Sequence, residues 1–188
     1  MNDEIEFHSV DRINIGAVGD PGQRTFLIQA RSGDQIITLV CEKIQVLDLS
    51  ERIYQLLLAA GQQSLARQIV RALAEGEEAS VPPADFEEDE PAWRIGRLDL
   101  LYDTSLEMVA LECDELTDSM IDQDEEDSLD QGPGSEARFW VTFAQLGLIW
   151  TQAMTCVTQG RPLCPLCGLP MEKDHKCFAT NGHKSGIG

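Results

Sequence analysis

The sequence predicts an α+β fold, in which helices pack on one face of a mainly antiparallel sheet. Short segments with alternating or β-branched residues fill the first 43 positions and return between residues 93 and 142, which is typical of strands. Two longer segments, at about 46–74 and 142–160, repeat apolar residues at helical spacing. The chain has 188 residues, of which 43% are apolar, so it has enough apolar material for one core.

Four strands are expected near the amino terminus, because short alternating segments are separated there by turn residues. The clearest are the alternation in residues 25–29 and the β-branched run in residues 36–40. Residues 31–34 (RSGD) predict a hairpin turn between these two. The expected strands are 5–8, 12–18, 24–30 and 35–41.

Two helices are expected next. Asp48 and Glu51 have the spacing of a capping box, and apolar residues at helical spacing lead from there to Gly61, which is predicted to end the first helix. The second helix is predicted from Ser64 to Ala74, where the apolar repeat continues.

The second half of the domain is expected to add three strands and a helix. A hairpin is predicted around Asp103 and Thr104, and a further strand precedes a second capping box made by Thr142 and Gln145. That helix is predicted to stop at Gly160. The expected strands are 93–102, 106–111 and 138–142.

The charge of the chain is very uneven. With 33 acidic and 14 basic residues the net charge is -19, so its overall field does not attract nucleic acid or anionic membranes. Eighteen of the acids lie in residues 75–90 and 112–130, which contain no base. Pro, Gly and Ser lie within or just after these runs. We therefore expect acidic loops at about 75–90 and 112–136, interrupting a nearly neutral domain of residues 1–160.

The compartment and the isolated cysteines can also be read from the sequence. The first residues, MNDEIE, lack the basic and apolar regions of a signal peptide, and no apolar run reaches the length of a membrane span. We expect a cytoplasmic protein. Cys41, Cys113 and Cys156 lie far apart among apolar neighbours, which is typical of core residues rather than of a disulfide framework.

Residues 161–188 carry the strongest chemical signal. Cys164 and Cys167 have the Cys-x-x-Cys spacing that lets two thiolates bind one ion, and His175 and Cys177 follow within ten residues. Three thiolates and an imidazole complete a tetrahedron. The four residues therefore predict a closed structural zinc site in a small knuckle. Because closed coordination leaves no position for a water, no catalysis is assigned to the metal.

Other interpretations of this tail stay open. His183 is an alternative ligand, since its spacing from Cys177 is more relaxed than that of His175. A redox Cys-x-x-Cys normally opens a helix, whereas Gly168 and Pro170 follow here, and an iron-sulfur centre more often uses four cysteines. A reduced tail without metal is the remaining reading.

The sequence lacks the common catalytic motifs, such as a phosphate-binding Gly-rich loop with Lys, a dinucleotide fingerprint, a zinc-protease motif or a nucleophile elbow. The best polar cluster combines Arg24, Glu42, Lys43 and Gln45, with Asp11 and Arg12 as further members. If the first strands pair as predicted, several of these side chains meet at one end of the sheet, where they can bind an anionic ligand. The alternative is a set of solvated surface ion pairs.

Several stretches, taken together and in order, resemble a bacterial family of unknown function met chiefly in actinobacteria. The stretches are residues 19–26 (GDPGQRTF), 42–45 (EKIQ), 93–96 (WRIG), 160–170 (GRPLCPLCGLP), 175–177 (HKC) and 181–182 (NG). The resemblance spans nearly the whole chain. It implies a shared pathway with a phosphoinositide-kinase-like protein and a histidine-phosphatase-like protein, but no particular reaction.

The resemblance also bears on single residues. It favours His175 and Cys177 over His183, because the family pattern is similar to His-x-Cys there, and it adds weight to Arg24 and the cluster around it. Two hypotheses follow. The first is a non-catalytic cytoplasmic binding or adaptor protein, for a protein or small anionic partner, with structural zinc. The second is an enzyme or anionic-ligand binder that uses the polar cluster around Arg24 and Lys43.

Overall fold

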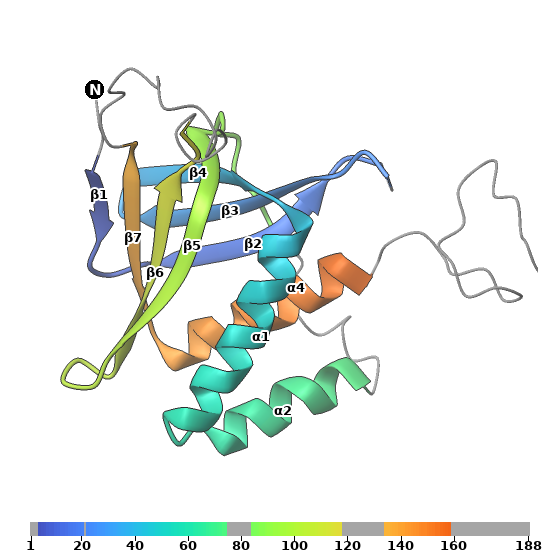
Figure 1. Cartoon of the computed structure of the whole chain (residues 1–188), viewed down its shortest axis with the longest axis vertical. Coiled ribbons are helices and arrows are strands. Elements are labelled where there is room, and N and C mark those ends of the chain that lie inside the picture. The colour runs from blue at the N-terminus through green and yellow to red at the C-terminus, as the bar shows by residue number, and fades with distance from the viewer. Residues whose placement is uncertain (1–3, 21, 75–83, 118–133, 159–188) are drawn as a thin grey trace, which may run out of the picture.

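The computed structural model describes residues 4–20, 22–74, 84–117 and 134–158. Within them, seven strands form one sheet in the order β1-β7-β6-β5-β4-β3-β2, and three helices lie beside it, so the α+β class is confirmed (Figure 1). The strands are β1 (Glu4–Phe7), β2 (Arg12–Val18), β3 (Thr25–Ser32), β4 (Gln35–Cys41), β5 (Trp93–Asp103), β6 (Met108–Glu115) and β7 (Glu136–Val141). The helices are α1 (Lys43–Ala59), α2 (Gln63–Ala74) and α4 (Phe143–Thr158).

The sheet is mixed rather than purely antiparallel. β4 pairs with β5 in parallel, and β1 pairs in parallel with β7, at the opposite edge from β2. Only residues 8–11 join β1 to β2, and this link reaches about 18 Å at most. A flat sheet would hold its outer strands about 29 Å apart. The sheet must therefore curl, and Figure 1 shows β2, β3 and β4 crossing the other four strands.

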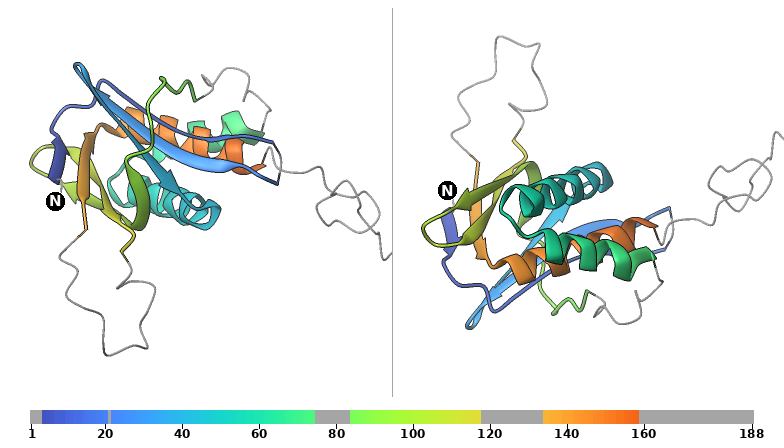
Figure 2. Two further views of the ribbon diagram at one scale, coloured as in Figure 1. Left: turned by 90° about the horizontal axis from the view of Figure 1, so that it is seen from above. Right: turned by 90° about the horizontal axis from the view of Figure 1, so that it is seen from below.

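The three helices lie together on one side of the sheet, as predicted (Figure 2). α4 contacts β2 and α1, while α2 packs against α1 and α4. The core between the layers is apolar and includes Ile15, Leu39, Ile53, Phe139 and Ile149, each at most 1% exposed. These side chains come from both crossing parts of the sheet and from two helices, so the described residues share a single core.

The first helix begins earlier than predicted. Its first residue is Lys43, and the Gln45 Oε1 accepts a hydrogen bond from the backbone N–H of Glu42 at 2.8 Å. Asp48 instead lies in the second turn and forms an ion pair with Arg52 at 2.7 Å. Asp48 fits the sequence pattern of a cap, but Glu42 holds the extended backbone conformation that a capping position requires. The capping box of Thr142 and Gln145 in α4 is confirmed.

The second acidic loop is shorter than the predicted 112–136, because β6 continues to Glu115 and β7 begins at Glu136. Two of the acids that were assigned to this loop, Glu112 and Asp114, face arginines on neighbouring strands. Glu112 accepts a hydrogen bond from Arg138 at 2.9 Å, and Asp114 accepts one from Arg97 at 2.7 Å. A count of local bases misses such partners, since they come from strands far away in sequence. Residues 118–133 lie outside the described part.

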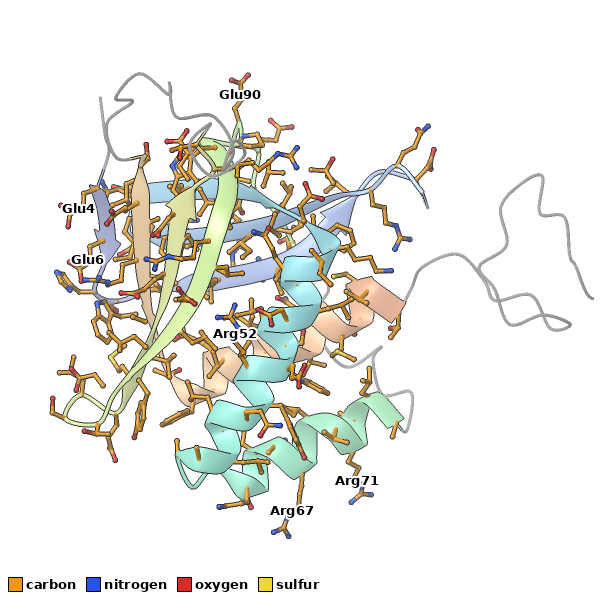
Figure 3. All side chains as sticks on the ribbon, viewed as in Figure 1. Glu4, Glu6, Arg52, Arg67, Arg71 and Glu90 are labelled. Carbon is orange, nitrogen blue, oxygen red and sulfur yellow. The ribbon has the colours of Figure 1, made fainter. Side chains whose placement is uncertain are left out.

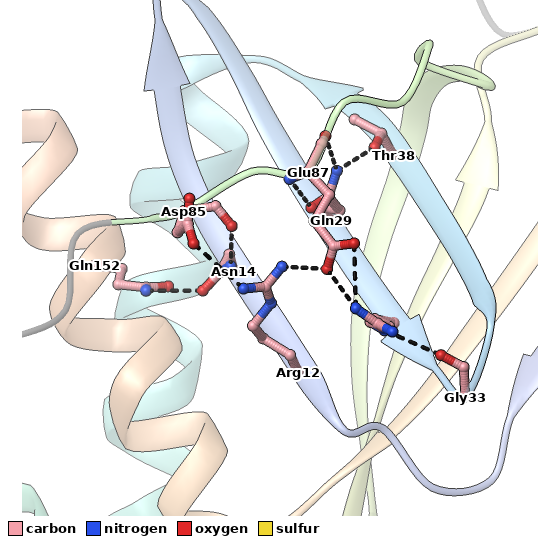
Figure 4. A network of polar contacts seen from close by, with 9 residues as sticks. Arg12, Asn14, Gln29, Gly33, Thr38, Asp85, Glu87 and Gln152 are labelled. Carbon is pink, nitrogen blue, oxygen red and sulfur yellow. Dashed lines mark hydrogen bonds and ion pairs between the residues drawn. The ribbon is translucent and has the colours of Figure 1, made fainter.

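The described part of the first acidic loop, residues 84–90, is irregular as predicted, but it packs on the sheet instead of extending into solvent. Residues 75–83 lie outside the described part, but residues 84–90, which we call the strap, cross the outer face of β2 and β3 (Figure 4). Glu87 forms ion pairs there with Arg12 and Arg31. Its charge is therefore neutralised within the fold rather than solvated in an excursion.

In the described ranges, none of the helices is both long and apolar enough to cross a membrane.

Candidate functional site

The predicted polar cluster is divided between the two ends of the sheet. Arg24 precedes β3, and Glu42, Lys43 and Gln45 follow β4, so these four lie at one end because β3 and β4 are antiparallel and Phe26 is opposite Cys41. Asp11 and Arg12 lie at the opposite end, where Arg12 is opposite Arg31. The structure thus brings together the four residues that were singled out and separates them from the further two.

Glu42 and Gln45 make contacts that hold α1 against β5. The Gln45 Nε2 donates to the carbonyl oxygens of Ile95 and Gly96, at 3.1 and 3.2 Å. The register of β5 shifts between Ile95 and Arg97, so these carbonyls lie at an irregularity of the ladder and need another donor. The Glu42 carboxylate forms an ion pair with Arg94. Both side chains therefore have structural partners.

Arg24 and Lys43 lie near the carboxyl end of α4. The Arg24 Nη1 donates to the carbonyl oxygen of Cys156 at 3.4 Å, and a cation at this end of a helix offsets the negative pole of its dipole. Burial raises the pKa of the Cys156 thiol to about 11, although the positive charges of Arg24 and Lys43 act to lower it. Lys43 is the more exposed of the cluster's two cations, so its positive charge faces solvent at this surface.

The three cysteines of the described part lie in or beside the core, as predicted. Their burial predicts that the stability of the fold depends on pH. Burial raises the pKa of Cys41 to about 12 and that of Cys113 well above its usual value. The neutral thiols stabilise the folded state fully below pH 9, and this contribution is lost as the pH rises from about 9 to 12. We expect urea unfolding to show falling stability above pH 9. The variant Cys41→Ala should fall less steeply, by up to about 1.4 kcal/mol per pH unit; equal slopes would contradict the burial of this thiol.

An apolar groove opens between the three helices, and we call it the helical groove. It has a volume of about 310 Å³. Its lining residues are Leu47, Ser50, Glu51, Tyr54, Val70, Trp150 and Met154. Leu47 and Val70 are 38% and 41% exposed, and Ile44, one turn before Leu47, is 70% exposed. The groove was not predicted from the sequence. The available signal was that α1 carries more apolar residues than one buried stripe requires.

The predicted zinc ligands Cys164, Cys167, His175 and Cys177, like the alternative His183, lie outside the described residues. Among the residues that are described, no group of three or more His, Cys, Asp or Glu side chains is arranged to hold a metal ion. The zinc site therefore stays a prediction from spacing.

Comparison with known proteins places this domain and its tail in one family. Residues 5–177 match the model of a family described as protein of unknown function, DUF3090. No curated protein and no solved structure matches the chain. The matched range covers every described strand and helix except the first residue of β1, and it also includes the four predicted zinc ligands. The chain therefore belongs to the DUF3090 family of proteins of unknown function.

Proposed function

We propose that this protein is a non-catalytic, cytoplasmic binding protein that docks a partner protein in the helical groove. The observation that carries the proposal is the exposed apolar lining supplied by three helices. A continuous, hollowed apolar surface marks a site where another molecule binds and covers it, whereas scattered apolar residues do not. Leu47, Val70 and Met154 come from α1, α2 and α4, so the lining is continuous across all three.

The groove suits an amphipathic helix with basic side chains. Among the described residues that line it, Glu51 is the one with a charge, while Arg67 and Arg71 on α2 point away from the helical layer (Figure 3). The net charge of the whole chain is -19, which adds a long-range attraction for a basic partner. An open groove between helices accepts the apolar face of another helix through anchors spaced three or four residues apart. Lys or Arg beside those anchors would then pair with Glu51.

The carboxyl-terminal tail is proposed to hold structural zinc through Cys164, Cys167, His175 and Cys177, on the basis of ligand type and spacing. The metal would order the tail and would take no part in a reaction. The kinase-like and phosphatase-like proteins implied by the family resemblance are the first partners to test.

The docking proposal predicts selective binding of a basic amphipathic peptide. We expect a labelled helical peptide of leucine and lysine to bind, and its counterpart of leucine and glutamate not to bind, in fluorescence anisotropy. Leu47→Asp should weaken binding at least about tenfold, because it places a charge among the apolar contacts. Glu51→Gln should reduce the preference for the basic peptide.

The matched control is Leu106→Asp. Leu106 is 58% exposed and lies in the turn between β5 and β6, away from the groove lining. This variant should bind like the unmodified chain. Docking of a partner protein in the groove would be refuted if Leu47→Asp and Leu106→Asp weakened peptide binding equally. It would also be refuted if the unmodified chain self-associated and Leu47→Asp made it monomeric, because the groove would then bind a second copy of the chain.

A further inference from the structure

The strap is held on the sheet by bonds to its backbone, which come from side-chain amides of the strands. The Gln29 Oε1 accepts from the backbone N–H of Glu87 at 2.9 Å, and the Gln29 Nε2 donates to the carbonyl of the same residue at 3.0 Å. The Asn14 Nδ2 donates to the carbonyl of Asp85 at 2.8 Å (Figure 4). Partners two residues apart on the strap fit an extended segment. These contacts recognise a backbone and do not depend on the sequence of the strap.

The selectivity of the surface comes from two arginines. Arg12 and Arg31 are directly opposite each other on β2 and β3, a like-charge pair that repels unless an anion lies between them. The Glu87 carboxylate fills that position. Arg31 Nη1 contacts both of its oxygens, at 3.0 and 3.2 Å, and Arg12 forms an ion pair with it. Arg12 also reaches Asp85 at 3.5 Å. The surface therefore selects a carboxylate at this position.

A glycine leaves room for the strap. A Cβ on Gly16 of β2 would lie 2.7 Å from the Cβ of Ala84 and 3.2 Å from the ring of Phe86. Both distances are shorter than ordinary van der Waals contact, so a larger residue here excludes the strap. The surface thus admits an apolar side chain just before the carboxylate.

Under the strap lies a row of three polar side chains, and some of their hydrogen-bond partners are residues outside the strap. Asn14, Gln29 and Thr38 are cross-strand neighbours, at most 5% exposed. Gln29 also donates to the Thr38 Oγ1 at 2.8 Å, and Asn14 accepts from Gln152 at 3.0 Å. If the strap leaves, water solvates the freed amides and guanidinium groups, while these bonds keep the row in place. Such a surface is formed before its ligand binds, and exchange of the strap for another segment leaves no unpaired polar group buried.

From these contacts we propose that the outer face of β2 and β3 binds an extended acidic segment of a partner protein, and that the strap is an internal occupant that competes with it. The partner's segment has a carboxylate in the place of Glu87, an apolar residue directly before it, and a backbone N–H where Gln29 accepts. This surface is separate from the helical groove, and neither proposal depends on the other.

The test uses the full chain and a labelled peptide with the sequence of residues 84–90 (ADFEEDE). Glu87→Gln in the protein keeps the size of the strap but removes its charge from between the arginines. We expect this variant to bind the peptide at least tenfold more tightly than the unmodified chain in fluorescence anisotropy, because a charge-assisted bond then favours the free peptide. Glu88→Gln is the control, since Glu88 is exposed and has no partner among the described residues. It should leave affinity unchanged.

Two further variants locate the site. In the Glu87→Gln background, Arg31→Gln should abolish the gain by removing the charge, and Gly16→Ala should abolish it by steric exclusion. A peptide carrying Glu87→Gln should bind weakly to every form. The side-chain amide NMR signals of Asn14 and Gln29 should shift when the peptide binds, which also reports that the variants are folded. If Glu87→Gln and Glu88→Gln bind the peptide alike, or if the gain survives both Arg31→Gln and Gly16→Ala, the proposal is overturned.

Discussion

Cys164→Ser is expected to abolish zinc binding by the purified protein, which should otherwise carry about one ion per chain. Three thiolates and an imidazole within fourteen residues, 164–177, match the donor set of a closed tetrahedral zinc site. Apparent zinc binding to such sets is on the order of 10 kcal/mol, and loss of one thiolate removes a quarter of the coordination. Elemental analysis measures the metal content directly, and release to a colorimetric chelator after thiol modification gives an independent count.

The chain supplies matched controls for this prediction. Cys156→Ser changes a thiol in α4 that is outside the proposed set, so its zinc content should stay unchanged. His175→Ala should lose the metal and His183→Ala should keep it, and the reverse result would exchange the two ligands. Protein that is purified metal-free with all six cysteines reduced, and that takes up no added zinc, would rule out the site.

Local patterns in the sequence were sufficient to predict most of the fold. The spans of β2 and β4 agree with the predicted 12–18 and 35–41, because alternation and β-branched residues mark half-buried strands directly. The start of α1 was missed because its cap is Glu42, a residue type that capping preferences do not favour, whereas Asp48 within the helix matches them better. Propensity ranks residue types, while the position of a cap depends on where β4 ends.

Features that depend on distant partners could not be predicted. Neighbouring strands usually pair, yet β1 lies beside β7 because the sheet curls and brings its two edges near residues 8–11. Glu112 of β6 and Glu87 of the strap were assigned to solvent because their arginines, Arg138 and Arg31, are far away in sequence. The same limit applies to the candidate sites. The sequence predicted that Arg24 and Lys43 lie at one end of the sheet. It did not predict that Arg24 contacts a carbonyl at the end of α4.

Gln152 shows the same limit in a single residue, and it leads to the second large expected effect. It lies inside the mostly apolar helix α4, and it is 4% exposed. Its Oε1 accepts from the backbone N–H of Ile15 at 3.1 Å, on the side of β2 that has no neighbouring strand among the described residues, and its Nε2 donates to the Asn14 Oδ1. A side chain of α4 thus accepts from a backbone N–H of the sheet's edge strand, to which a further strand would otherwise pair.

Gln152→Met should destabilise the protein by about 3 kcal/mol, since each buried group left without a partner costs about 1–3 kcal/mol while the flexible thioether fills a similar volume. Urea unfolding measures this free energy, and Gln55→Met, at an exposed position of α1, should change it by less than about 0.5 kcal/mol. Because the loss is local to the edge, hydrogen exchange of the Ile15 amide should accelerate more than that of Ile28, which lies opposite it on β3. Unchanged stability together with an equally protected Ile15 amide would mean that the edge is satisfied without Gln152. Acceleration confined to Ile15 and its neighbours would instead identify this glutamine as the residue that closes the β2 edge.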